Sequence, residues 1–328
     1  MKALVYEGPR TMTIRDAPIP EPAADEVLIR VAHAGICGSE LGGYLGHNSL
    51  RKPPLIMGHE FSGTVERAGR DVSRLRAGDR VTANPLVTCG KCFACTTGSA
   101  QLCAERKLLG AHLPGAFAEY VVAPERNVFP LEAHVSMEEG AYTEPFACAV
   151  HICSLLRPHP GDRLLIVGAG PIGLLALQAL RIFGVEDVTV VDLNEERLEI
   201  ARELGARTST RTGDAGAFDA AVDAVGAQAT RTACALAVRP GGSVVFTGLH
   251  EAESRLPIND MIRSEIRTCG AFAYSPADFT DAQRWIAQGK VQLAPWTSIV
   301  PLKEGGASFD KLIGNPGKTA KILLVPGG

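Results

Sequence analysis

The sequence predicts an α/β protein in which a β-rich first part precedes a doubly wound parallel sheet. Short apolar segments bounded by turn residues recur before residue 136, where helical patterns are scarce. After residue 161, apolar strands alternate with helical segments, which is the rhythm of a parallel sheet with right-handed crossovers. The length of 328 residues is sufficient for two domains.

The β-rich part consists of segments that alternate or cluster apolar residues between turns. We expect strands at residues 2–6, 11–15, 27–34, 60–68 and 80–83. The character changes at Ser136, because Ser136 and Glu139 have the spacing of a capping box and predict a helix start.

The alternating part begins with a buried strand at residues 164–167. Further strands are expected at 188–192, 220–224 and 243–247, and helices at 171–183, 195–204 and 227–237. The tail adds a helix at 277–288 and a strand at 320–325, which we interpret as a return to the first domain. We therefore expect one domain over residues 141–274 and another over residues 1–140 and 275–328.

The composition is that of an ordinary globular protein, with 46% hydrophobic and 21% charged residues. A net charge of -3 gives no electrostatic reason to expect nucleic acid or an anionic membrane as a partner. The longest uncharged run, residues 164–180, is shorter than the roughly 20 residues that span a bilayer. The first residues lack the pattern of a secretory signal, so we expect a cytoplasmic protein.

A glycine-rich motif predicts a dinucleotide site. Gly168, Gly170 and Gly173 form a Gly-x-Gly-x-x-Gly pattern between the strand at 164–167 and the following helix. Gly168 permits a tight turn, Gly170 lets the backbone approach a pyrophosphate, and Gly173 lets helix and strand pack closely. Pro171 and Ile172 begin the helix whose N–H groups and dipole favour phosphate.

The cofactor expected at this motif is NAD. Asp192 ends the next strand, where a carboxylate can accept both hydroxyls of the adenosine ribose and repel a 2′-phosphate. Arg197 is the only nearby cation, and we expect it to flank the adenine. Gly248 and Leu249, after the strand at 243–247, complete the expected cofactor-binding residues.

Four cysteines lie within fifteen residues and predict a structural zinc site. Cys89, Cys92, Cys95 and Cys103 offer the number and type of ligand that a closed tetrahedral zinc site requires. The alternative is four unrelated thiols, which the short spacing makes the weaker interpretation.

A second group of metal-ligand residue types is spread more widely: Cys37, His59, Glu60 and Glu144. A catalytic zinc needs about three protein ligands and an open position. Spacing alone does not bring these residues together, because a lone cysteine, histidine or glutamate is more often structural.

The motifs as a set resemble one family. Gly-Ile-Cys-Gly-Ser, Gly-His-Glu-Phe-Ser-Gly, the four-cysteine lobe, Thr-Glu-Pro-Phe and Gly-Ala-Gly-Pro-Ile-Gly occur in the order seen in zinc-containing medium-chain dehydrogenases. The resemblance covers essentially the whole chain and is strongest to the sorbitol, threonine and sugar-alcohol branch. It implies a GroES-like, zinc-containing catalytic domain (1–140 and 275–328) and a Rossmann NAD-binding domain (141–274).

The resemblance also implies residue roles and two zinc ions per chain, one structural and one catalytic. Cys37 and His59 match catalytic zinc ligands, Glu60 matches the carboxylate that ligates the metal or holds its water, and Glu144 matches the third or exchanging ligand. Ser39 matches the hydroxyl that takes the alcohol proton. The zinc would act as a Lewis acid on a substrate hydroxyl, and the substrate carbon would give a hydride to the nicotinamide.

Two positions depart from the family pattern. Gly42 stands where many alcohol dehydrogenases have a histidine, so the proton relay beyond Ser39 is open, and His47 could replace it only if the loop folds back. Ala273 stands where sorbitol dehydrogenases have an arginine, which puts plain sorbitol in doubt. Tyr44 and Tyr274 are then candidates for either substrate contact or packing.

The expected function is oxidation of a secondary alcohol, with a polyol or sugar alcohol as the preferred substrate class. An L-threonine or other amino-alcohol dehydrogenase is an enzyme alternative, and a nucleotide-binding structural or regulatory protein is a non-enzyme alternative. The family commonly forms dimers and tetramers, so we expect a homodimer or homotetramer that acts on a small-molecule alcohol.

Overall fold

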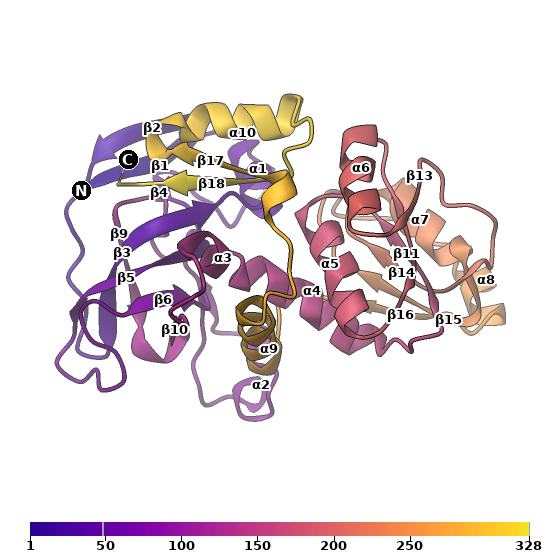
Figure 1. Ribbon diagram of the computed structural model, residues 1–328, viewed down its shortest axis with the longest axis horizontal. Helices are drawn as coiled ribbons and strands as arrows, with labels where there is room; N and C mark the ends of the chain where they lie inside the picture. Colours follow the sequence, from indigo (N-terminus) through magenta and orange to yellow (C-terminus); the bar gives the residue numbers. More distant parts are fainter. Residues whose placement is uncertain (48, 328) are drawn as a thin grey trace. The chain divides into compact units, whose positions relative to one another are not determined.

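The computed structural model describes residues 1–47 and 49–327, which form two compact units (Figure 1). The first unit comprises Met1–Glu144, Ala282–Gly289 and the C-terminal segment from Trp296. The second comprises Pro145–Asp281 and Lys290–Pro295. Among the described residues, the model contains no helix that combines the length and apolar character needed to cross a membrane.

A seven-stranded sheet forms the centre of the first unit. Its order is β10-β6-β5-β3-β18-β17, and β9 pairs with β3 as well. The bounds are β3 (Glu26–Gly35), β5 (Glu60–Ala68), β6 (Arg80–Ala83), β9 (Tyr120–Pro124), β10 (Val128–Pro130), β17 (Thr297–Pro301) and β18 (Lys321–Val325). The C-terminal strand β18 is antiparallel to β3, with Leu324 opposite Ala34. Residues nearly 300 positions apart therefore share one sheet.

Smaller sheets, and helices that lie wholly within the first unit, accompany this sheet. The strands are β1 (Lys2–Gly8), β2 (Thr11–Asp16) and β4 (Leu55–Ile56) in one sheet, and β7 (Leu86–Val87) with β8 (Lys107–Leu108) in another. The helices are α1 (Gly38–Tyr44), α2 (Phe93–Thr96), α3 (Met137–Ala141) and α10 (Gly305–Gly314). The predicted capping box is confirmed, because Ser136 Oγ accepts from Glu139 N and the Glu139 carboxylate accepts from Ser136 N.

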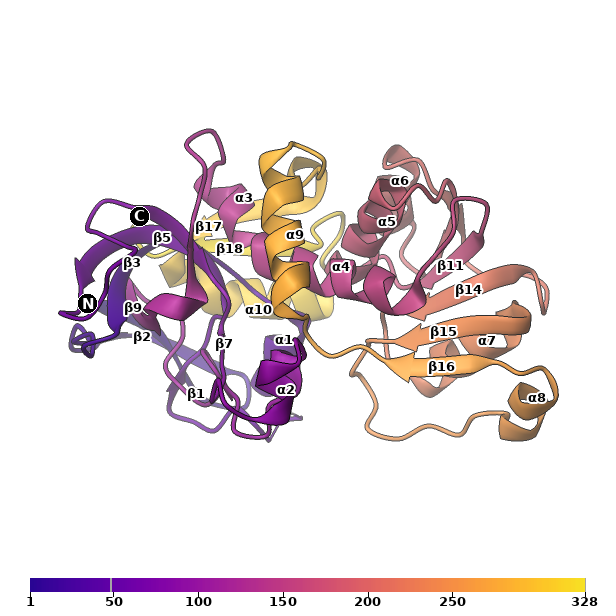
Figure 2. The same ribbon diagram turned by 90° about the horizontal axis from the view of Figure 1, so that it is seen from below.

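The second unit is a parallel sheet of six strands in the order β13-β12-β11-β14-β15-β16, of which Figure 2 labels β11, β14, β15 and β16. The strands are β11 (Arg163–Val167), β12 (Asp187–Val191), β13 (Arg207–Ser209), β14 (Phe218–Asp223), β15 (Val238–Phe246) and β16 (Arg267–Gly270). The helices α5 (Pro171–Ile182), α6 (Glu195–Glu203), α7 (Gln228–Ala237) and α8 (Ile258–Arg263) connect them. When the strands of this sheet are numbered from 1 (β11) to 6 (β16) along the chain, their order across the sheet is 3-2-1-4-5-6. This is the doubly wound arrangement. The predicted fold class is therefore confirmed.

Two helices contribute residues to both units. α4 (Thr143–Leu156) and α9 (Pro276–Ala287) are continuous helices, and the division falls within them at residues 144 and 281. The boundaries drawn from sequence patterns, 140 and 274, stand before these helices because the pattern changes where a helix begins. Within the second unit, His151 Nδ1 and Ser154 Oγ bind the buried carboxylate of Asp278 at 2.8 and 2.6 Å.

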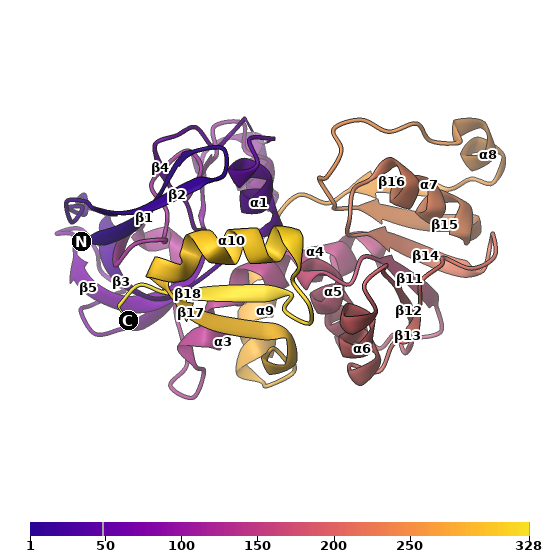
Figure 3. The same ribbon diagram turned by 90° about the horizontal axis from the view of Figure 1, so that it is seen from above.

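An aromatic cluster stabilises α10 in the first unit, where the helix packs against α1 and β2 (Figure 3). Phe309 is fully buried, with its ring centroid 5.0 Å from that of Tyr44 and 6.1 Å from that of Phe117. Such ring pairs add to the free energy that burial of apolar area contributes. The cluster therefore joins the tail of the chain to its first helix.

Replacement of Phe309 by alanine should destabilise the first unit by about 3–5 kcal/mol, since it leaves a cavity in a packed core. Phe93→Ala is the matched control, because Phe93 is 83% exposed and should cost under about 0.5 kcal/mol. Scanning calorimetry measures both. A midpoint for Phe309→Ala equal to that of Phe93→Ala would contradict the assignment of Phe309 to the core.

Candidate metal and cofactor sites

The four cysteines of the predicted lobe converge. The Sγ distances are 3.5 Å for Cys92 to Cys95, 3.6 Å for Cys103 to Cys89 and 3.9 Å for Cys89 to Cys95. A tetrahedral ion with Zn–S bonds of about 2.3 Å has sulfurs separated by about 3.8 Å. The cluster therefore has the dimensions of a closed zinc site, and these four residues would hold a structural zinc.

The lobe favours the thiolate form of Cys89, whereas at Cys92 the backbone N–H of Cys95 is outweighed by hydrogen bonds with the neighbouring thiols, which raise the pKa of Cys92 to about 11. Backbone N–H groups of Lys91 and Cys92 lower the pKa of the Cys89 thiol to about 6. Cys92 is the N-cap of the short helix α2, and Cys95 lies within that helix. The N–H groups of Lys91 and Cys92 thus point at the sulfur of Cys89 and stabilise its negative charge.

Cys37, His59 and Glu60 form a second group whose ligand atoms all lie within 4.8 Å of one another. Strand pairing explains this, because Gly35 at the end of β3 lies opposite Glu60 at the start of β5. Cys37 follows β3 as the N-cap of α1, and His59 precedes β5. A Cβ on Gly35 would lie 2.3 Å from Glu60 Oε2, so a side chain at this position would displace the carboxylate. A thiolate, an imidazole and a carboxylate are donors that suit zinc.

The buried carboxylate of Glu40 holds this group in place. Its Oε2 accepts from Cys37 N at 3.0 Å, and its Oε1 accepts from Gly58 N at 2.9 Å. Oε1 also contacts His59 Nδ1 at 2.8 Å. A hydrogen bond at Nδ1 leaves Nε2 as the nitrogen available to a metal. One carboxylate therefore fixes both loops that carry the ligands.

Charges around His59 favour its cationic form when no metal is bound. Burial disfavours the imidazolium, but the negative charges of Glu40 and Cys37 outweigh burial and raise the pKa of His59 well above its usual range. Burial alone would raise the pKa of the Glu40 carboxyl. The positive charges of His59 and Arg51 outweigh burial and hold this pKa below its usual range. A divalent cation in this group would replace the proton as the compensating charge.

Glu60 has a cationic partner of its own. Lys321 Nζ, at the start of β18, donates to Glu60 Oε1 at 2.8 Å and Oε2 at 2.6 Å and to the carbonyl of Ile36 at 3.1 Å. Lys321 is 1% exposed. Burial alone would lower the pKa of Lys321, but the negative charges of Glu60 and Cys37 outweigh burial. The pKa is therefore raised above its usual value, and the ammonium form is retained. Glu60 is thus within reach of a metal while both its oxygens are engaged by Lys321.

The remaining predicted residues of this site are placed differently. Glu144 is buried in the first turn of α4, but it does not belong to the group of ligand atoms within 4.8 Å. Ser39 Oγ lies 3.4 Å from Cys37 Sγ and accepts a hydrogen bond from Arg51 Nη2 at 3.1 Å. Glu144 as a ligand and Ser39 as the proton acceptor stay predictions.

Three other expectations can be compared with the structure. His47 is exposed, and its backbone N–H is bonded to the carbonyl of Gly42 at 2.9 Å. Tyr44 is 2% exposed, and its hydroxyl donates to Asp310 Oδ1 at 3.0 Å. Tyr274 is 1% exposed, with its ring centroid 5.5 Å from that of Phe279. Of the two alternatives for these tyrosines, the structure supports packing.

The glycine motif has the geometry of a nucleotide loop. Gly168 has φ = 108°, which favours glycine, and a Cβ on Gly173 would lie 1.8 Å from the carbonyl oxygen of Gly168. A Cβ on Gly170 would meet no atom within 4 Å, so that position is open to a ligand. Pro171 and Ile172 begin α5, and their N-cap is Gly170. The turn lies at the carboxyl end of β11, next to β14, where the strand order reverses.

Asp192 supports this loop directly. Its Oδ2 accepts from Ala169 N at 2.7 Å and its Oδ1 accepts from Asn194 N at 2.8 Å. The Nε of Arg197 is buried and has no hydrogen-bond partner within residues 1–47 and 49–327. Gly248 lies against the backbone of Val225, and Leu249 is 80% exposed. The carboxylate therefore lies at the loop that a dinucleotide would occupy.

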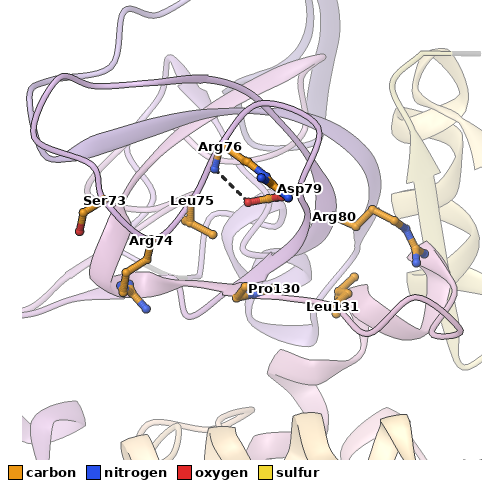
Figure 4. Close-up of a pocket in the computed structure, with 8 residues that line it drawn as sticks. All are labelled: Ser73, Arg74, Leu75, Arg76, Asp79, Arg80, Pro130 and Leu131. Atoms are coloured by element: carbon orange, nitrogen blue, oxygen red, sulfur yellow. Dashed lines mark hydrogen bonds and ion pairs between the residues drawn. The ribbon is translucent and has the colours of Figure 1, made fainter.

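A separate surface pocket of about 450 Å³ contains none of these residues (Figure 4). It is lined by Ser73, Arg74, Leu75, Arg76, Asp79, Arg80, Pro130 and Leu131. The guanidinium of Arg80 donates to the carbonyls of Glu132, Ala133 and Val135, and Arg76 pairs with Asp79. These arginines therefore stabilise neighbouring loops.

Sequence reasoning did not identify three residues that build the Cys37–His59 group: Glu40, Arg51 and Lys321. An acidic residue three positions after the ligand cysteine, in the first turn of a helix, was the available signal for Glu40. Arg51 and Lys321 had no local signal, because their contacts depend on the loop after α1 and on the pairing of β18 with β3.

Two family models match the chain. Residues 23–133 match the alcohol dehydrogenase GroES-like domain, and residues 171–288 match the zinc-binding dehydrogenase domain. The chain is 35% identical to sorbitol dehydrogenase of Bacillus subtilis, with 84% of this chain and 83% of that protein covered. It is 33% identical to L-idonate 5-dehydrogenase of Vitis vinifera, with 88% and 84% covered.

Solved structures of related proteins have the same fold over 99% of this chain. Galactitol-1-phosphate dehydrogenase of Escherichia coli superposes with a TM-score of 0.92 at 27% identity, covering 99% of this chain and 100% of the other. An alcohol dehydrogenase of Escherichia coli CFT073, solved with NADH, gives 0.92 at 28% identity with 99% of each chain covered. A zinc-binding dehydrogenase of Sinorhizobium meliloti, solved with NADP, gives 0.90 at 29% with 99% of each covered. The chain belongs to the zinc-binding alcohol dehydrogenase family, with a GroES-like domain and a nucleotide-binding domain.

Proposed function

We propose that this protein oxidises a secondary alcohol of the polyol or sugar-alcohol class, with zinc bound at Cys37 and His59 and with NAD as hydride acceptor. The observation that carries the proposal is the convergence of Cys37, His59 and Glu60 around one point, organised by Glu40. The relatives named sorbitol dehydrogenase and L-idonate 5-dehydrogenase support the substrate class.

The residues in and around the Cys37–His59 group have different proposed roles. A zinc ion held there supplies Lewis acidity toward a substrate hydroxyl. Glu40 keeps His59 in the tautomer that presents Nε2, and Lys321 neutralises Glu60 so that the two carboxylates do not place uncompensated charge beside the metal. The family resemblance supports Ser39, whose hydroxyl lies 3.4 Å from Cys37 Sγ, as the proposed acceptor of the proton that the alcohol loses.

NAD is proposed as the cofactor because of Asp192. Its carboxylate lies at the loop of Gly168–Gly173, where it can bind ribose hydroxyls and would repel a 2′-phosphate. Relatives solved with NADH and with NADP both exist, so the preference of this chain rests on its own residue. We further propose a cytoplasmic homodimer or homotetramer.

A substrate screen tests the proposed function. With NAD, the protein should oxidise at least one polyol, sugar alcohol or sugar-alcohol phosphate, and it should oxidise a simple secondary alcohol more slowly. The absorbance of NADH measures both rates. Threonine is included because the amino-alcohol alternative predicts it as the preferred substrate. Inactivity of the zinc-loaded protein toward every alcohol would refute the proposal.

Metal analysis tests the two zinc sites. The wild type should bind about two zinc ions per chain, and Cys37→Ser and Cys92→Ser should each bind about one. Cys37→Ser should keep its thermal stability and lose turnover, whereas Cys92→Ser should melt earlier because the lobe loses its metal. Cys269→Ser, outside both groups, should retain both ions. Retention of about two ions by Cys37→Ser would rule out Cys37 as a ligand.

Substitution of Asp192 tests the cofactor assignment. Asp192→Ala should weaken NAD binding by about 10- to 100-fold, the effect of losing hydrogen bonds to a charged group, and should weaken NADP binding less. Asp187→Ala, at the opposite end of β12, is the control and should leave the preference unchanged. Binding of NADH and NADPH by fluorescence measures both. An unchanged preference in Asp192→Ala would remove Asp192 from the ribose role.

A further inference from the structure

Arg51 is a buried cation next to the metal group that the proposed chemistry does not yet use. It is 4% exposed. Its Nη1 donates to the carbonyl of Ser39 and its Nη2 donates to Ser39 Oγ, both at 3.1 Å. A single guanidinium therefore holds the backbone and the side chain of one residue in its planar fork.

The loop is shaped to admit this side chain. A Cβ on Gly43 would lie 2.5 Å from Arg51 Cδ and 3.3 Å from its Cβ, so the stem of Arg51 occupies the space beside a glycine. Gly42, in the same helix, has no atoms within 4 Å of an added Cβ. The stem of Arg51 thus passes beside Gly43 to reach Ser39.

Burial of the charged Arg51 side chain costs free energy, and hydrogen bonds to its neighbours offset only part of this cost. Its Nε is buried and has no hydrogen-bond partner in the described part of the chain. The carboxylate of Glu40 is close enough for the charge of Arg51 to act on it. A buried cation with an unsatisfied donor is expensive to maintain. A role in orienting Ser39 explains why the side chain is nevertheless directed to this hydroxyl.

We propose that Arg51 is a positioning residue that holds the Ser39 hydroxyl in the orientation that receives the proton of the substrate alcohol. The inference rests on the proposed function. Arg51 donates to one lone pair of Ser39 Oγ, and the hydroxyl is left facing Cys37 Sγ at 3.4 Å. The guanidinium keeps its own proton at any working pH, so it fixes the acceptor and does not take part in the transfer.

The proton balance is simple. The O–H bond of the substrate breaks and a new O–H bond forms on Ser39 Oγ, while Ser39 passes its own proton to water. The substrate carbon gives its hydride to the nicotinamide, and Arg51 is unchanged throughout. Arg51 thus supports Ser39 in a chain where Gly42 offers no side chain to a proton relay and His47 is exposed.

Kinetics of Arg51→Met and Arg51→Lys, each in the wild-type and S39A backgrounds, test this role. Arg51→Met should lower kcat by about 10- to 100-fold with little change in KM, because it removes a charge-assisted hydrogen bond that acts in the chemical step. Arg51→Lys should recover part of kcat. In S39A, Arg51→Met should cause no further loss. Lys52→Met, an exposed neighbour, is the control and should resemble the wild type. An equal loss in both backgrounds, or an unchanged kcat in Arg51→Met, would overturn the proposal.

A crystallographic readout separates this inference from the proposed function. Crystal structures of zinc-loaded wild type and Arg51→Lys should show Ser39 in one rotamer, and Arg51→Met should show it rotated away or in several. A single unchanged rotamer in Arg51→Met would overturn the positioning role. If the wild type oxidises no alcohol, the proposed function fails while this comparison still decides whether Arg51 orients Ser39.

Discussion

The carboxylate of Glu40 is the interaction on which the candidate metal site depends. The pairing of Gly35 with Glu60 brings the loop after β3 close to the loop before β5, and Glu40 then ties Cys37 to His59 beyond the paired residues. Glu40 accepts from the N–H groups of Cys37 and Gly58 and binds His59 Nδ1, all within 3.0 Å. Such a fully buried charge is stable only with several donors and a nearby cation. The same contacts that satisfy Glu40 therefore orient both ligands.

Charge compensation extends this arrangement. Glu60 is paired with Lys321, and Arg51 lies on the other side beside Ser39 and Glu40. These two buried cations come from distant parts of the chain and offset two buried carboxylates, so the thiolate of Cys37 and a metal ion would be the remaining charges. A ligand set balanced in this way leaves the metal able to polarise a substrate hydroxyl.

Prediction from sequence succeeded where the signal was local. The alternation of strands and helices after residue 161 gave the doubly wound sheet, and the short spacing of Cys89, Cys92, Cys95 and Cys103 gave a cluster whose sulfurs converge. Where the contact is long-range, the residue pattern alone did not group the ligands: the family resemblance placed Cys37 with Glu60, and the role of Lys321 was not predicted. The antiparallel pairing of β3 with β5 and β18 brings together Cys37, Glu60 and Lys321, and no periodicity encodes that pairing. β17 and helix α10 were not predicted either, because β17 has only five residues and α10 begins with two glycines, which are poor helix formers.

The most direct test of this account is the zinc affinity of the Cys37–His59 site in Glu40→Gln and Glu40→Ala, measured by competition with a chromogenic chelator. Loss of the group that orients the ligands should weaken this site by about 10- to 100-fold in Glu40→Ala and less in Glu40→Gln, which retains one acceptor oxygen. The affinity of the Cys89–Cys103 lobe should not change, and it serves as an internal reference. An unchanged affinity in Glu40→Ala would show that Cys37 and His59 are held by other contacts and would contradict the account.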